Sequence, residues 1–120
     1  GTDELTTTGV SYVASLADGA VTTFEVSPTD AGLEKAKPED LKGGNSEYNA
    51  GAIRRVLAGE TGPFRDVILY NTAAALIIAD KAEDLKDGIA LAAKSVDSGK
   101  AKAVLEKMIQ ITNSNNDPQE

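Results

Sequence analysis

The sequence contains no cysteine and no histidine among its 120 residues. Without cysteine the chain has no disulfide and no thiolate, and without histidine it has no imidazole base and no histidine metal ligand. A nucleophile–base pair that uses a cysteine thiolate or a histidine imidazole is therefore excluded within this chain. The lack of cysteine is typical of a reducing compartment, so we expect a cytoplasmic location.

Aromatic residues and positive charge are also scarce. The chain has three Tyr and two Phe, yet 41% of its residues are apolar, which predicts a core of Ala, Leu, Ile and Val. It carries 12 basic and 19 acidic residues, a net charge of −7, whereas nucleic-acid binding requires a basic surface. We expect no nucleic-acid partner and, without a signal peptide or a spanning segment, no membrane partner. A local site or a metal ion can still bind a phosphorylated small molecule.

The most apolar stretch is PFRDVILYNTAAALIIA, residues 63–79. Its apolar residues cover nearly every direction around a helix, which predicts a buried helix that other elements cover. Pro63 suits the first helical position, where its missing N–H costs nothing. At about seventeen residues, with Arg65, Asp66 and Asn71 inside it, the stretch is too short and too polar for a membrane span.

A β-hairpin is predicted before this helix. Residues 10–17 and 20–26 are rich in β-branched and aromatic residues, and Asp18-Gly19 between them favours a two-residue turn. Both faces carry apolar residues, and a two-stranded ribbon alone is marginally stable in water, so we expect it to join a larger sheet or lie against helices. The predicted register pairs Val13 with Phe24, Leu16 with Val21, and Ala17 with Ala20.

The remaining sequence predicts a connector, three more helices and a tail. Pro28, Pro38 and several glycines make residues 27–45 an irregular connector. We expect residues 1–112 to form one unit with a hairpin over about 10–26, and a polar tail over 113–120. The local fold class is α+β. The predicted helices cover about 46–58, 63–80, 83–97 and 100–111.

Asp3 and Glu4 are the candidate metal ligands. Two adjacent carboxylates on an irregular segment supply the hard oxygen ligands that Mg²⁺ takes together with substrate phosphates and water. The alternative is a pair of solvated acids, because acidic pairs are common on protein surfaces.

Two pairs of residues could meet an anion. Gly43-Gly44 precedes a predicted helix, but it lacks the Lys and Ser/Thr of a P-loop and the spacing of a dinucleotide fingerprint, so we interpret it as a structural turn. Arg54-Arg55 could also face an anion, as could Arg65.

Two polar positions of the central helix favour structural roles. Arg65 followed by Asp66 at the helix start favours an ion pair or a cap. Asn71 lies where the helix is expected to be buried, and its amide needs hydrogen-bond partners there. We interpret Asn71 as an anchor to the backbone or to a neighbouring helix.

Short motifs follow one another in a specific order along residues 3–109. They are Asp3-Glu4-Leu5, Thr8-Gly9, Asp18-Gly19, Leu41-Lys42-Gly43-Gly44, Asn49-Ala50, Val56-Leu57-Ala58-Gly59-Glu60, Gly62-Pro63, Arg65-Asp66, Ala73-Ala74-Ala75-Leu76 and Asp97-Ser98-Gly99-Lys100-Ala101. This ordered set resembles the C-terminal third of the anthranilate phosphoribosyltransferases, within the nucleoside phosphorylase-like phosphoribosyltransferase family. The start at Gly1, without Met, also favours a piece of a longer protein.

The resemblance implies an α/β parent: a small helical domain plus an α/β domain with a mostly parallel sheet, which the hairpin completes. It implies transfer of phosphoribosyl from phosphoribosyl pyrophosphate to the amine of anthranilate, in tryptophan biosynthesis. It assigns Asp3 and Glu4 to a Mg²⁺ ion, and the complete protein to a homodimer.

The resemblance also implies that much of the site lies outside this chain. The family's Gly-rich pyrophosphate loop, its phosphoribosyl contacts and its anthranilate-contacting Arg precede the segment seen here, so we expect no catalytic residue in this piece and no activity from it alone. The missing N-terminal part is then its partner. Two alternatives stay open, namely a noncatalytic scaffold or binding module of shared ancestry, and a related nucleoside phosphorylase-like enzyme with another acceptor.

Overall fold

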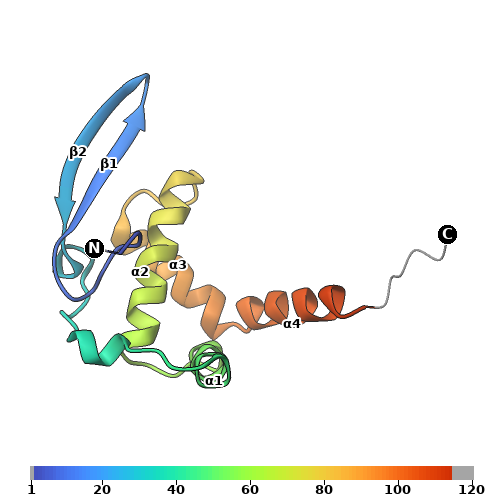
Figure 1. Cartoon of the computed structure of the whole chain (residues 1–120). Coiled ribbons are helices and arrows are strands. Elements are labelled where there is room, and N and C mark those ends of the chain that lie inside the picture. The colour runs from blue at the N-terminus through green and yellow to red at the C-terminus, as the bar shows by residue number, and fades with distance from the viewer. Residues whose placement is uncertain (1, 115–120) are drawn as a thin grey trace.

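The computed structural model describes residues 2–114, so the predicted tail beyond Ser114 lies outside the described residues. A hairpin is followed by a connector with two short 3-10 turns and by four α-helices (Figure 1). This confirms the predicted hairpin and four helices. The elements are β1 (Ser11–Ala17), β2 (Ala20–Val26), η1 (Pro28–Ala31), η2 (Pro38–Leu41), α1 (Ser46–Leu57), α2 (Pro63–Ile78), α3 (Leu85–Asp97) and α4 (Lys100–Thr112).

The hairpin forms in the predicted register. Val13 pairs with Phe24 and Ala17 with Ala20. Asp18 and Gly19 have φ values of 51° and 77°, the positive angles that a tight two-residue turn of this hand requires. The far end of the hairpin extends away from the helices (Figure 1), and Leu16 and Val21 near its turn are 73% and 66% exposed.

Helix α2 packs chiefly against α3, and its C-terminal end at Ile78 is exposed. Leu69 contacts Ala92 and Val96 of α3 in a buried cluster. The prediction of burial all round is wrong for this chain, because Ile78 at the end of α2 is 85% exposed. The C-terminal end of α2 at Ile78 has no cover among residues 2–114, so the all-round apolar pattern includes a surface that the described residues do not bury.

A second cluster joins the hairpin base to α2. Val26, Ala31 and Tyr70 are buried together, and Leu5 and Leu85 pack against them. The hairpin base, the connector and the first residues of the chain therefore meet on one side of α2.

Two helix ends differ from the predicted bounds because of local backbone chemistry. Helix α3 begins at Leu85, since the Asp84 carboxylate accepts a hydrogen bond from the Asp87 N–H and acts as the N-cap. Helix α2 ends at Ile78, and Asp80 adopts a left-handed conformation with φ of 56° that stops the helix.

Helix α4 extends away from the other helices (Figure 1). None of its residues is buried, and Val104 is 70% exposed. Within residues 2–114, no helix combines the length and the apolar character needed to cross a membrane.

Candidate functional site

Asp3 and Glu4 lie on an irregular segment before β1, and both are exposed. No group of three or more His, Cys, Asp or Glu side chains that could hold a metal ion occurs in the described part of the chain. Two exposed carboxylates without a nitrogen or sulfur ligand fit Mg²⁺, which binds through one or two carboxylates and completes its shell with phosphates and water. The pair is thus suited to part of a site that a substrate completes.

The residue after this pair is bonded to α2. The Leu5 N–H donates to Oδ1 of Asn71 over 2.9 Å, and Nδ2 of Asn71 donates to the Leu5 carbonyl over 2.9 Å. Nδ2 also donates to the Val67 carbonyl within α2, at 3.0 Å. Asn71 is therefore the polar anchor that the sequence predicted, and its target is the segment that carries the acidic pair.

Two further elements hold the same segment. The Thr6 N–H donates to Oγ of Ser11 at the start of β1, over 2.9 Å. The Ala36 N–H of the connector donates to the Thr7 carbonyl, also over 2.9 Å. Thr7 is completely buried. An irregular segment without strand or helix bonds is thus fixed at three consecutive residues from three parts of the fold.

Two open hollows border this region. A hollow of about 380 Å³ lies beside Glu4 and Asn71, and its apolar wall is formed by Leu5, Leu41, Phe64, Val67 and Ile68. A larger groove of about 780 Å³ lies between the hairpin and the far side of α2, lined mainly by apolar residues that include Leu16, Phe24, Ile77 and Ile78. The groove is the surface that the predicted burial of α2 would require another element to fill.

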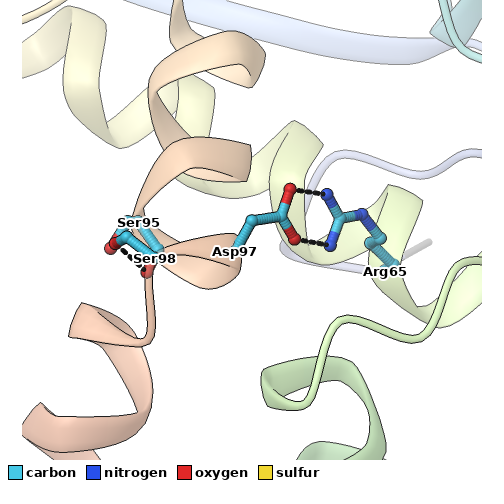
Figure 2. A network of polar contacts seen from close by, with 4 residues as sticks. All are labelled: Arg65, Ser95, Asp97 and Ser98. Atoms are coloured by element: carbon cyan, nitrogen blue, oxygen red, sulfur yellow. Dashed lines mark hydrogen bonds and ion pairs between the residues drawn. The ribbon is translucent and has the colours of Figure 1, made fainter.

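Arg65 is ion-paired, as predicted, and its partner comes from α3. Its two terminal nitrogens donate to the two carboxylate oxygens of Asp97 at 2.8 and 2.9 Å (Figure 2). The Arg65 side chain is only 11% exposed. The hydrogen bond from Arg65 lowers the pKa of the Asp97 carboxyl, whereas burial raises the pKa of the neighbouring Asp66. This guanidinium is already bonded, so it is not a free anion ligand.

The other candidates also have structural surroundings. The Gly44 N–H donates to Oδ1 of Asn49 at 2.9 Å. Nδ2 of Asn49 donates in turn to the Gly44 carbonyl at 3.0 Å. A Cβ on Gly43 would lie 2.9 Å from Oδ1 of Asn49, so Gly43-Gly44 is a structural turn. Arg54 and Arg55 occupy the last turn of α1, where Arg55 pairs with Glu60 over 3.3 Å.

The comparison with known families decides the family. Residues 1–102 match the model of a glycosyl transferase family, described as its a/b domain. The chain belongs to this family. The match includes the acidic pair, its anchor Asn71 and all elements from β1 to α3.

Curated relatives are similar over nearly the whole chain. An anthranilate phosphoribosyltransferase from Parvibaculum lavamentivorans is 59% identical over 116 residues, which is 97% of this chain and 34% of the relative. Another from Beijerinckia indica is 53% identical over the same shares. The chain therefore spans about a third of the length of the curated relatives it matches.

Solved structures confirm the α/β parent fold. The anthranilate phosphoribosyltransferase of Thermus thermophilus has a TM-score of 0.84 at 36% identity, covering 95% of this chain and 34% of that one. A variant of the Saccharomyces cerevisiae enzyme with Mg bound has a TM-score of 0.79 at 28% identity, covering 88% and 31%.

Proposed function

We propose that this chain is the C-terminal third of an anthranilate phosphoribosyltransferase, a transferase that uses phosphoribosyl pyrophosphate and anthranilate. The observation that carries the proposal is 59% identity over 116 residues to an enzyme of that name, together with a TM-score of 0.84 to a solved one. A change of acceptor within the family would keep this fold, and no feature of the described residues favours one.

The proposed reaction is a substitution at the anomeric carbon of the ribose. The anthranilate nitrogen forms a bond to C1, the bond from C1 to the pyrophosphate oxygen breaks, and the amine loses one proton. The products are N-(5′-phosphoribosyl)anthranilate and pyrophosphate. Negative charge increases on the leaving group, so groups that stabilise it accelerate the reaction.

The proposed role of Asp3 and Glu4 is to hold Mg²⁺ beside the substrate phosphates. The ion supplies Lewis-acid and electrostatic stabilisation of the leaving pyrophosphate when bound. Both carboxylates are exposed and stand next to the anchored Leu5, so they offer oxygens to a ligand from outside the chain.

The substrate-binding groups belong, in this proposal, to the remaining two thirds of the protein. Within residues 2–114 no group of three or more potential metal ligands occurs, so the acidic pair makes only part of a site. The complete protein would be a cytoplasmic homodimer, and the 120-residue chain alone would be inactive.

The test uses the complete protein and measures phosphoribosyl transfer to anthranilate against Mg²⁺ concentration. Asp3→Asn with Glu4→Gln should lower turnover and raise the Mg²⁺ concentration needed for half-maximal rate, with unfolding unchanged. Glu25→Gln with Glu106→Gln removes the same charge from exposed positions on β2 and α4 and should change neither.

Two results would overturn parts of the proposal. A complete protein that transfers nothing to anthranilate would favour the scaffold or another acceptor. An unaltered Mg²⁺ dependence in the Asp3/Glu4 double variant would remove these two residues from the metal site.

A further inference from the structure

Asn71 uses its side-chain groups in a way that fixes their orientation. A carboxamide has two N–H donors and one oxygen acceptor. Nδ2 donates to the carbonyls of Leu5 and Val67, and Oδ1 accepts from the Leu5 N–H, all within 3.0 Å. Both donors are engaged and the oxygen is bonded, so one orientation of the amide satisfies the whole set.

The Asn71 side chain holds the main chain of Leu5, the residue directly after the acidic pair. Its N–H and its carbonyl both bond to the one side chain, as a neighbouring strand would bond them. Glu4 directly precedes Leu5, and Asp3 directly precedes Glu4. The bonds at Thr6 and Thr7 hold the segment beyond Leu5, so among the described residues Asn71 provides the side-chain tether from another element that is nearest to the pair.

The tether also comes from a well-held part of the fold. On either side of Asn71 in α2, Tyr70 is completely buried in the cluster at the hairpin base, and the Thr72 hydroxyl donates to the Ile68 carbonyl. The Val67 carbonyl, one turn earlier, accepts the third bond of the amide. Movement of the Leu5 main chain relative to α2 would therefore break two hydrogen bonds at once.

We infer that Asn71 is a positioning residue for metal binding, which holds the Asp3–Glu4 carboxylates in place by clamping the main chain of Leu5. The inference rests on the proposed role of that pair. Two carboxylates on a mobile segment would lose conformational freedom when they bind a cation, and a segment ordered in advance avoids that loss. Groups that orient metal ligands commonly change metal affinity 10–100-fold when they are removed.

The test is Mn²⁺ binding to the complete protein, measured from the electron paramagnetic resonance signal of free Mn²⁺. The site in question is the one lost in the Asp3→Asn/Glu4→Gln variant. We expect Asn71→Ala to weaken Mn²⁺ binding at that site 10–100-fold. Asn71→Asp should do the same while keeping the side-chain shape, because a carboxylate has no proton to donate to the Leu5 carbonyl.

The matched control is Leu69→Ala on the same helix. Leu69 is buried against α3 in a cluster whose buried residues differ from those beside Leu5, with Ile89 packing against both clusters. This control should lower the stability and leave Mn²⁺ affinity unchanged. Amide hydrogen exchange of Leu5 should quicken in Asn71→Ala, which removes the oxygen that accepts its N–H, and stay slow in the control.

Each contrary result has a distinct meaning. Wild-type Mn²⁺ affinity in both Asn71 variants, with binding lost in the Asp3/Glu4 variant, would overturn the positioning role and leave the proposed metal site intact. Unchanged binding in the Asp3/Glu4 variant would overturn both. Equal weakening in Leu69→Ala and Asn71→Ala would show that general destabilisation, and not the clamp, governs the affinity.

Discussion

At the residue scale, a close contact between α2 and α3 depends on a missing side chain. A Cβ on Gly88 of α3 would lie 2.7 Å from both Cα and Cβ of Ala73 in α2. Atoms at that distance overlap, and neither a helix backbone nor a methyl group can rotate away. Gly88 is therefore the residue that lets α2 and α3 approach each other.

We expect Gly88→Ala to lower the free energy of unfolding of the complete protein by about 1–3 kcal/mol, the usual cost of overpacking. Gly51→Ala in α1 is the matched control, since its Cβ would meet only the flexible end of Arg55 at 3.4 Å. That change should be neutral or stabilising by up to about 1 kcal/mol through helix propensity. Urea unfolding measures both, and equal effects would contradict the tight contact.

Tyr70 carries an unusual hydroxyl. The residue is completely buried, and its hydroxyl makes no hydrogen bond within residues 2–114. An unpaired buried polar group costs about 1–3 kcal/mol. We expect Tyr70→Phe to leave the thermal midpoint of the complete protein unchanged or raise it. A clear decrease would reveal a partner for the hydroxyl outside the described residues.

The roles of single residues were more predictable than their partners. The sequence indicated that Arg65 is ion-paired and Asn71 is an anchor, because a mostly apolar helix must satisfy its polar groups. It did not indicate Asp97 or Leu5, which lie 32 and 66 positions away. A periodic pattern shows which way a side chain points, but not which distant backbone reaches it.

At the element scale, the two sides of α2 differ in what covers them. Leu69 is 4% exposed against α3, whereas Ile78 lines the open groove beside the hairpin. We expect Leu69→Ala to lower the free energy of unfolding by about 2–5 kcal/mol, because it truncates a side chain buried between α2 and α3. In the complete protein Ile78→Ala should also destabilise, if the groove is filled by the remaining chain. Chemical denaturation of both variants checks this, and no cost at Ile78 would leave the groove open.

The link between α2 and α3 at Arg65 and Asp97 makes stability depend on acid. The folded pKa of Asp97 lies below its ordinary value of 3.8 because of the guanidinium. The pair therefore stabilises the fold above about pH 4, and this contribution is lost as the pH falls through the lowered pKa. Asp97→Asn should lower the melting temperature at pH 7. Between pH 7 and pH 3 the melting temperature of this variant should fall less than that of the unmodified protein.

Asp30 adds to the same acid response, since hydrogen bonds from Ser27 lower its pKa as well. The informative quantity is thus the difference between Asp97→Asn and the unmodified protein. If the two melting temperatures differ by the same amount at pH 7 and pH 3, the ion pair does not contribute in the predicted way.

Elements with strong local signals were predictable from the sequence. Asp18-Gly19 specified the hairpin and its register, and Pro63 marked the start of α2. Helix ends were less predictable, since the predicted start of α3 at residue 83 lies before Asp84, whose side chain caps the helix that begins at Leu85. Helix α4 was predictable as a helix, but the sequence did not indicate that Ala101 alone joins the cluster of α2 and α3 while Val104 stays exposed.

At the scale of the whole molecule, the chain is more extended than its length suggests. Its radius of gyration is 16.7 Å, with extents of 51 × 37 × 28 Å. A compact domain of this length has a radius of about 13–14 Å. The projecting hairpin and α4 account for the difference (Figure 1), and both expose apolar residues.

We expect the 120-residue chain, produced alone, to associate or aggregate and to bind a hydrophobic dye, because large exposed apolar surfaces favour association. Size-exclusion chromatography with light scattering measures this directly. A monomer that unfolds in one cooperative step would contradict the expectation and favour an autonomous module.

The acidic pair shows where sequence reasoning needed more than local pattern. Asp3-Glu4 is one of several exposed acidic pairs, and only the resemblance of the surrounding motifs distinguished it. The anchoring of its segment by α2, β1 and the connector depends on contacts between distant residues, which only the folded arrangement provides.

The clamp on Leu5 has a consequence for which substitutions the protein tolerates. Asn71 contacts main-chain atoms that every residue except proline shares, so among the other residues the identity of position 5 is limited by its packing against the cluster of Val26, Ala31 and Tyr70. Isoleucine or methionine should be accepted there. Proline should not, because it lacks the N–H that Oδ1 accepts. In a saturation library, position 71 should therefore tolerate far fewer residues than position 5.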